Sequence, residues 1–155
     1  VETTEEMYDA VRTHADASDV IVMAAAPADF RPRHRADHKL KKTADHSVSP
    51  LDLVETPDIL AALVADRRAG QVLIGFAAET GDADGGVLDH ARAKLARKGC
   101  DLLVVNDVSG GAVFGSDRTG AVILGADDSS IEVPTGPKAL LAEAIWDVVA
   151  TRWLS

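Results

Sequence analysis

Three short apolar runs, separated by segments with helical patterns, constrain the fold of this chain more than any other feature. The runs are Val20–Met23, Gln71–Phe76 and Leu102–Val105. They lack the alternation of a half-exposed strand, and such continuous runs are typical of strands covered on both faces. Because a helix or a long connection follows each run, we expect a Rossmann-like, doubly wound α/β fold with a mainly parallel sheet.

The segments between the runs carry signals for where helices start and stop. Thr3 and Glu6 form a capping-box pattern ahead of a first helix. In a second helix, Thr56 is expected to be the N-cap and Pro57 the first helical residue, with Gly70 at the end. The later predictions are a short strand around Leu51–Val54, a helix over about Val87–Lys98, a hairpin of Ala121–Leu124 with Ser130–Val133, and a last helix over Lys138–Leu154.

The bulk numbers favour one globular domain. The chain has 155 residues, of which 46% are apolar and 26% charged. Its single cysteine, Cys100, excludes an internal disulfide, and no signal pattern or 18-residue apolar stretch is present, so we expect a cytoplasmic protein without a membrane span. Since an α/β domain normally places a strand before its first helix, we also expect part of the domain to precede Val1.

The charge is unevenly distributed. The net charge is −9, which argues against a general nucleic-acid surface. The segment Arg31–Lys42 nevertheless contains six Lys and Arg residues against one acid, Asp37. Its lysines Lys39, Lys41 and Lys42 suit phosphate binding. An anionic ligand beside this segment and a merely solvated basic loop are both open at this point.

Polar groups follow small residues at three predicted strand ends. They occur in Ala28-Asp-Phe30, Ala77-Ala-Glu79 and Asn106-Asp107. The carboxyl ends of parallel strands meet at one edge of a sheet, where ligands bind. Asp29 is either a turn aspartate that bonds its own backbone or a contact to a ribose, a base edge or a metal.

Two further features fit an anion. The segment Thr56–Leu60 begins a helix whose first N–H groups are free to bind one. Lys94 and Lys98 lie four residues apart on one helix face, where they either complement the helix C-terminus or reach the same ligand. The sequence has no GxGxxG, no P-loop, no metal-like Cys/His spacing and no nucleophile elbow, so covalent catalysis through the protein is not indicated.

Six motifs in a fixed order resemble the bacterial phosphopantothenoylcysteine synthetase family. They are Ala24-Ala-Ala-Pro-Ala-Asp-Phe-Arg-Pro32, Lys39-Leu-Lys-Lys42, Thr56-Pro-Asp-Ile-Leu60, Gly75-Phe-Ala-Ala-Glu-Thr80, Lys94-x-x-x-Lys98 and Asn106-Asp-Val108. Members usually form the C-terminal half of a bifunctional coenzyme A biosynthesis protein, fused to or associated with a flavin-dependent decarboxylase domain.

The resemblance implies a reaction and a site. CTP, with Mg²⁺, activates the carboxylate of 4′-phosphopantothenate as an acyl-cytidylate, and the amine of L-cysteine then displaces CMP. Lys39 is the implied catalytic residue. The implied CTP contacts are Ala28, Asp29, Phe30, Lys39, Pro57, Asp58, Ile59, Leu60, Phe76, Lys94 and Lys98. The metal ligands stay open, with Asp29 as a candidate.

The resemblance also implies an organisation for the chain. Residues 1–155 would form a single CTP-binding synthetase domain that lacks the family's first strand and its Asn/Ser/Gly-rich loop. The family is homodimeric, with neither a nucleic-acid nor a membrane partner. The runner-up is a Rossmann-like nucleotide- or dinucleotide-binding module without ligase activity, and a third candidate is a structural or dimerisation domain. A ligase prefers CTP, a dehydrogenase prefers NAD(P), and a structural module prefers neither.

Overall fold

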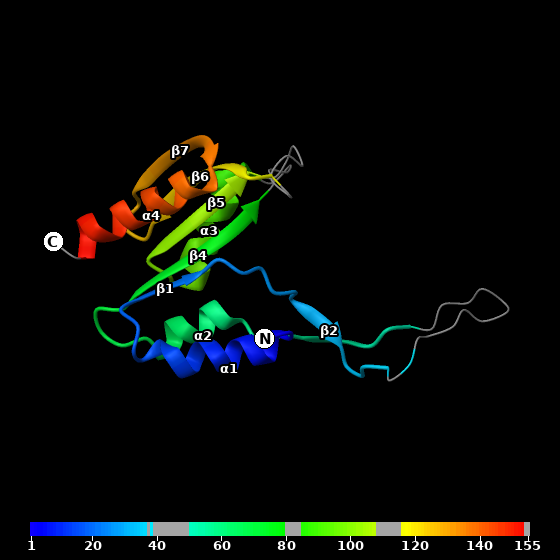
Figure 1. Ribbon diagram of the computed structural model, residues 1–155. Coiled ribbons are helices and arrows are strands. Elements are labelled where there is room, and N and C mark those ends of the chain that lie inside the picture. Colours follow the sequence, from blue (N-terminus) through cyan, green and yellow to red (C-terminus); the bar gives the residue numbers. More distant parts are fainter. Residues whose placement is uncertain (37, 39–49, 80–84, 108–115, 154–155) are drawn as a thin grey trace.

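A computed structural model describes residues 1–36, 38, 50–79, 85–107 and 116–153 (Figure 1). Four helices and seven strands are defined in this part of the chain. In chain order they are α1 (Thr4–Ala15), β1 (Val20–Met23), β2 (Phe30–Pro32), β3 (Leu53–Glu55), α2 (Ile59–Asp66), β4 (Val72–Glu79), α3 (Val87–Lys98), β5 (Leu102–Asp107), β6 (Arg118–Gly125), β7 (Ser130–Pro137) and α4 (Lys138–Trp153).

The central element is a five-stranded sheet with the order β1-β4-β5-β6-β7. Strands β1, β4 and β5 are parallel neighbours, whereas β6 is antiparallel to both β5 and β7. Thus β6 alone among these five strands runs against the others. The structure confirms the predicted α/β fold with a mainly parallel sheet, a C-terminal hairpin and a final helix.

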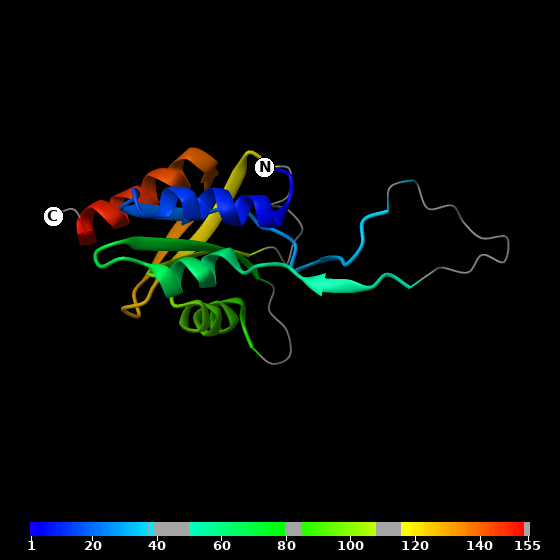
Figure 2. The same cartoon turned by 90° about the horizontal axis from the view of Figure 1, so that it is seen from below.

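Helices cover both faces of the sheet (Figure 2). Side chains alternate between the two faces along each strand. On one face Leu73 and Leu103 pack with residues of α2 and α3, and α1 packs against the same cluster. On the other face Ile74 and Val104 pack with the buried residues of α4. The two layers of helices account for the nearly unbroken apolar runs of β4 and β5.

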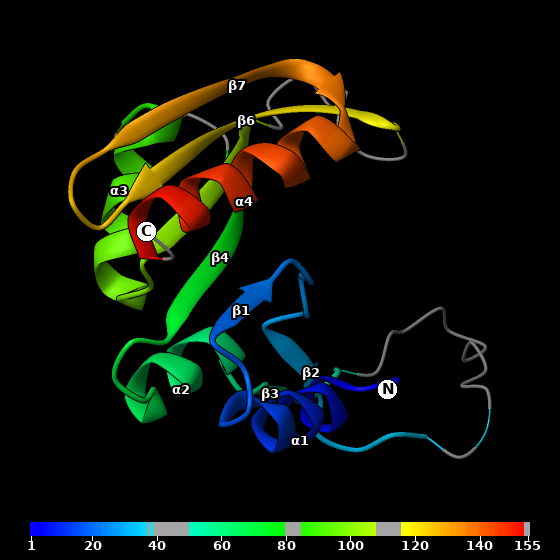
Figure 3. The ribbon, with the colours of Figure 1, turned by 60° about the vertical axis from the view of Figure 1, so that its left-hand side comes forward.

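Strand β1 is less buried than its sequence predicts. It lies at the edge of the sheet and, among the described residues, it pairs only with β4. Met23 is buried, but Val22 is 36% exposed. The difference arises because α4 contacts β6 and β7 and therefore lies away from β1 (Figure 3). A groove of about 330 Å³ follows β1 along α1.

The helix starts agree with the sequence in one case and differ in another. Thr3 caps α1, and the capping box is complete because Glu6 accepts a hydrogen bond from the Thr3 N–H. The prediction that Thr56 caps the second helix is wrong. Asp58 is the N-cap of α2, and its side chain accepts a hydrogen bond of 3.1 Å from the Ala61 N–H.

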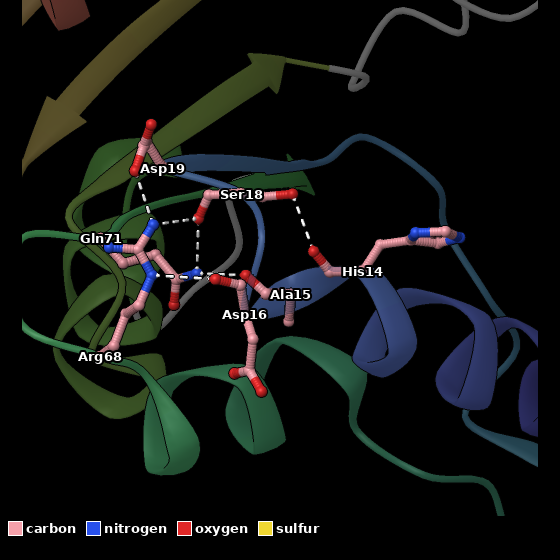
Figure 4. A network of polar contacts seen from close by, with 7 residues as sticks. All are labelled: His14, Ala15, Asp16, Ser18, Asp19, Arg68 and Gln71. Carbon is pink, nitrogen blue, oxygen red and sulfur yellow. Dashed lines mark hydrogen bonds and ion pairs between the residues drawn. The ribbon is translucent and has the colours of Figure 1, made fainter.

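A polar network fixes the turn between α1 and β1 against the turn before β4 (Figure 4). The side-chain amide of Gln71 donates to the carbonyl oxygens of Ala15 and Ser18, at 2.8 Å each. Arg68 donates to the carbonyl oxygen of Asp16 and to the carboxylate of Asp19. Because Gln71 is buried, these bonds satisfy its amide N–H groups and hold β1 in register with β4.

Strands β2 and β3 form an antiparallel pair that projects from the body (Figures 1 and 3). We call this pair the arm. An ion pair of 2.6 Å between Arg33 and Asp52 joins its two strands, and an ion pair between Arg31 and Glu5 joins it to α1. Phe30 is 57% exposed on the arm. None of the described helices is both long and apolar enough to cross a membrane.

Candidate functional site

Thr56 joins the loop after β1 to the start of α2. Its backbone N–H donates to the carbonyl oxygen of Asp29 at 2.9 Å, and its hydroxyl donates to the carbonyl oxygen of Ala28. Two residues later, Asp58 caps the helix. The loop and the helix N-terminus are therefore held side by side, next to the carboxyl end of β1. The sequence predicted that both belong to the site, but it assigned Thr56 to the cap.

Asp58 also binds the last lysine of α3. The Lys98 ammonium donates to the Asp58 carboxylate, so one side chain caps α2 and ties it to α3. Partial burial raises the pKa of Asp58, but the hydrogen bonds from Lys98 and from the Ala61 N–H lower it more. The net result is a pKa below the ordinary value. Asp58 is therefore an ionised carboxylate at neutral pH.

Lys94 is held by a second carboxylate from a different element. Its ammonium lies 2.7 Å from a carboxylate oxygen of Glu79, the last residue of β4. Both side chains are partly buried, with 30% of Lys94 and 19% of Glu79 exposed. Lys94 thus lies near the carboxyl end of β4 and Lys98 near the N-terminus of α2, and each is paired with an acid that the sequence analysis did not assign to it.

This arrangement can bind a polyanion. The first N–H groups of α2 carry partial positive charge, and the two ammonium groups approach from α3. A lysine has three N–H donors, so one can stay on its carboxylate while others reach a phosphate oxygen.

Ile59 and Leu60 differ in how they can contribute. The Ile59 side chain is 3% exposed and lies in the core, so only its backbone is available to a ligand. Leu60 packs over Gly75 of β4, where an added Cβ would come within 2.6 Å of the Leu60 Cδ2. Gly75 therefore allows the first turn of α2 to lie close to the sheet. Pro57, between Thr56 and the cap, is partly buried.

The predicted contact Phe76 lies apart from the two lysines. Its side chain packs with the cluster beneath α4, whereas Glu79 lies three residues further along the strand and faces α3. The alternation of side chains along β4 thus places the Phe76 ring and Lys94 on opposite faces of the sheet. The Phe76 backbone lies in the sheet itself, between these two faces.

Ala28, Asp29 and Phe30 are exposed along the loop after β1 and at the start of the arm. Among the residues that the structure describes, the Asp29 carboxylate has no hydrogen-bond partner, so the predicted turn in which it bonds its own backbone is not formed. Lys39, the predicted catalytic residue, and the neighbouring Lys41 and Lys42 lie outside the described residues.

Metal binding was left open by the sequence. Within the described ranges, no group of three or more His, Cys, Asp or Glu residues is placed to hold a metal ion. Mg²⁺ in nucleotide sites is usually held by one or two carboxylates together with phosphate oxygens. The carboxylate of Asp29 is exposed, lies beside the α2 N-terminus and has no partner in the described part of the chain, so it fits that kind of binding. Cys100 is buried and free, and burial raises the pKa of its thiol.

Sequence reasoning assigned incomplete roles to two residues of the site. Thr56 was predicted to be the N-cap of α2, two residues before the actual cap Asp58, because Thr and Asp are both good N-caps. Glu79 was noted at a strand end, but its partner Lys94 lies 15 residues away. A carboxylate after small residues at the end of a buried strand is the signal that marks Glu79.

Comparison with known proteins connects this chain to a family. The family model described as "DNA/pantothenate metabolism flavoprotein C-terminal domain" matches residues 1–152. The coenzyme A biosynthesis bifunctional protein CoaBC of Mycolicibacterium smegmatis is 49% identical over 94% of this chain, and that of Bacillus subtilis is 42% identical over 86%. The chain spans 36% and 32% of the length of these two relatives.

Solved structures share the fold. The C-terminal domain of a CoaBC protein matches with a TM-score of 0.72 and 30% identity, over 97% of this chain and 65% of that one. A Cab2 variant in complex with phosphopantothenate-cysteine matches with a TM-score of 0.71 at 17% identity, over 99% and 52% of the two chains, which is a likeness of fold. The chain therefore belongs to the DNA/pantothenate metabolism flavoprotein C-terminal domain family, which confirms the resemblance to the bacterial phosphopantothenoylcysteine synthetases.

Proposed function

We propose that this chain is the nucleotide-binding domain of a CTP-dependent phosphopantothenate–cysteine ligase of coenzyme A biosynthesis. The 4′-phosphopantothenate carboxylate attacks the α-phosphate of CTP, forming an acyl-cytidylate and releasing pyrophosphate. The amine of L-cysteine then attacks the acyl carbon. The amide forms, CMP leaves, and the amine loses a proton.

One observation supports the proposal: the family model matches almost the whole chain, and the chain brings a helix N-terminus and two lysines together near the end of β4. The relatives are named as coenzyme A biosynthesis proteins. The α2 N-terminus together with Lys94 and Lys98 suits a triphosphate. The first step joins two anions, so cations that neutralise the developing charge accelerate it.

In this proposal each part of the site has a task. The α2 N-terminus at Pro57–Leu60 and the two lysines of α3 bind the triphosphate. Asp29 holds Mg²⁺, which supplies additional positive charge to the phosphates when it is bound. Ala28, Phe30 and the Phe76 backbone are assigned to the cytidine, and Lys39 to the reacting phosphate. These assignments rest on the family motifs.

The proposal extends to the assembly. The relatives are named as bifunctional proteins and are about three times as long as this chain. We assign the additional length to a flavin-dependent decarboxylase domain and to the start of the synthetase domain. A homodimer belongs to the same proposal, as does a cytoplasmic location, which fits the free thiol of Cys100.

The test is pyrophosphate release by the natural polypeptide that contains this chain. We expect release that requires CTP, 4′-phosphopantothenate and Mg²⁺ together, and formation of the amide only after L-cysteine is added. ATP, GTP and UTP in place of CTP test the choice of base. If the polypeptide neither binds CTP nor releases pyrophosphate, the proposal is wrong. Tight binding of NAD(P) would then favour the dinucleotide-binding module.

A further inference from the structure

The two lysines of α3 are each paired with an acid from a different element. Lys94 is paired with Glu79 at the end of β4, and Lys98 is paired with Asp58 at the start of α2. Four residues separate the lysines, so their ammonium groups lie on one face of α3. The two acids come from different elements, and together the pairs bridge α2, α3 and β4.

The Lys94–Glu79 pair differs from an ordinary surface ion pair in its burial. The two side chains are 30% and 19% exposed, whereas those of Arg12 and Asp66, which join α1 to α2, are 47% and 58% exposed. An exposed pair has little effect on side-chain geometry, because solvent screens it and leaves the side chains free to move. A shielded pair restricts the ammonium to a narrow range of positions.

The local backbone explains why Glu79 can hold Lys94. Ala77 and Glu79 face the α3 side of the sheet, and Ala77 is small and buried in the cluster that contains Ala91 and Leu95. Close packing of α3 against β4 brings the Lys94 stem over the strand end. Glu79 is the last residue of β4, so its carboxylate meets the ammonium where the strand stops.

From this geometry we infer that Glu79 is a positioning residue, which holds the Lys94 ammonium at the phosphate-binding edge of the sheet before and during the reaction. The inference rests on the proposed ligase function. One N–H of the ammonium stays on Glu79, and the remaining donors point to the substrate phosphates. Glu79 therefore acts on turnover through Lys94. Its negative charge opposes anion binding, so it does not add affinity of its own.

This role predicts a separation of binding from turnover. In Glu79→Gln of the natural polypeptide, Lys94 keeps its charge but loses its fixed position. We expect kcat to fall roughly tenfold, because misplacing a catalytic-site cation costs turnover. The Kd for CTP, measured by calorimetry, is expected to stay the same or to become lower, since one repelling carboxylate is removed. Glu79→Asp, which keeps the charge on a shorter side chain, is expected to recover part of kcat.

A double-mutant cycle tests whether Glu79 acts through Lys94. In a Lys94→Gln background, Glu79→Gln is expected to change kcat less than about twofold, since the group that it positions is already absent. Asp127→Asn is the matched control. It removes one carboxylate from an ion pair of 3.1 Å at the opposite end of the sheet, with the cation Arg152, which is 24% exposed. The control is expected to leave both kcat and Kd unchanged.

Each result has one meaning. If wild-type protein uses CTP but Glu79→Gln behaves like Asp127→Asn, the inference is overturned and the proposed function stands. The inference is also overturned if Glu79→Gln lowers kcat equally with and without Lys94. It is overturned as well if Glu79→Gln lowers kcat, CTP affinity and melting temperature in parallel, because Glu79 would then have a structural role. If wild-type protein has no CTP-dependent activity, the proposed function fails as well.

Discussion

Gly75 illustrates how one residue sets the position of a helix. A methyl group at this position would lie 2.6 Å from the Leu60 Cδ2 and 3.2 Å from the Leu103 Cδ1. Because the Leu60 Cδ2 is the end of a flexible, partly buried side chain that can move aside, we expect Gly75→Ala to destabilise the fold by about 1 kcal/mol, the low end for an overpacked core. Urea unfolding measures this change.

The control for Gly75→Ala is a second variant that relieves the clash between the added methyl group and the Leu60 side chain. The double variant Gly75→Ala with Leu60→Ala should be more stable than the sum of the two single changes predicts, because the clashing methyl is gone. If the two effects simply add, α2 is not held at its distance from β4 by Leu60.

Asp58 gives a second prediction at the residue scale, for pH. Its pKa is lowered in the folded protein, where partial burial is outweighed by the hydrogen bonds from Lys98 and Ala61. A carboxyl group of this kind stabilises the fold above its unfolded pKa, and the contribution disappears as the pH falls through the folded value. With the side chain 47% exposed, we expect about 0.5–1 kcal/mol after solvent screening.

Asp58→Asn isolates this charge, because Asn caps helices as well as Asp does. The difference in unfolding free energy between wild type and variant should be largest above about pH 5 and should shrink on acidification. A difference that is constant with pH would mean that the cap, and not the ionised carboxylate, contributes the stability.

At the scale of elements, Thr56 couples the loop after β1 to α2. Thr56→Val keeps the shape but removes the hydroxyl that donates to the Ala28 carbonyl oxygen, so we expect a loss of about 1 kcal/mol in stability. Hydrogen exchange at the Thr56 N–H, which donates to the Asp29 carbonyl oxygen, should become faster, and CTP affinity should fall a few-fold. Thr56→Ser, which keeps the hydroxyl, is the control. Unchanged exchange in Thr56→Val would show that the backbone bond from Thr56 to Asp29 is sufficient.

Local signals in the sequence predicted the elements better than the pairs between them. The capping box at Thr3 and the apolar run of β4 both act within a few residues, so they could be recognised. A short strand was expected around Leu51–Val54, but its partner was not, because pairing with β2 depends on how the chain folds back.

The same limit applies to the candidate site. The lysines of α3 were predicted from family motifs and helical spacing. A helix start was predicted within Thr56–Leu60, but its cap was assigned to Thr56 and not to Asp58. Their pairing, and the bond of Lys94 to Glu79, depend on the packing of α3 against β4 and α2. The edge position of β1 was also missed, since an apolar run specifies that burial is favourable but not which element supplies it.

At the scale of the whole molecule, charge separation gives the last prediction. The chain has a net charge of −9, yet six of its Lys and Arg residues lie in Arg31–Lys42, a segment of the sequence that starts within β2. An acidic body repels a nucleoside triphosphate, so we propose that this segment supplies the attraction and that Lys39 acts directly on the reacting phosphate. Lys39→Gln is therefore expected to lower kcat at least about a hundredfold, as removal of a charge-stabilising contact does elsewhere.

The control for Lys39→Gln is Lys138→Gln, which makes the same change of charge at the exposed start of α4. It should leave kcat unchanged, and both variants should melt at the wild-type temperature. Salt separates the two contributions of Lys39. If Lys39 contributes general attraction, Lys39→Gln should have a higher KM than wild type at low salt. This difference in KM should disappear at high salt, because exposed charges are screened there. If Lys39 contacts the reacting phosphate directly, Lys39→Gln should lower kcat at every salt concentration. Equal kcat in Lys39→Gln and Lys138→Gln would mean that Lys39 has no catalytic role.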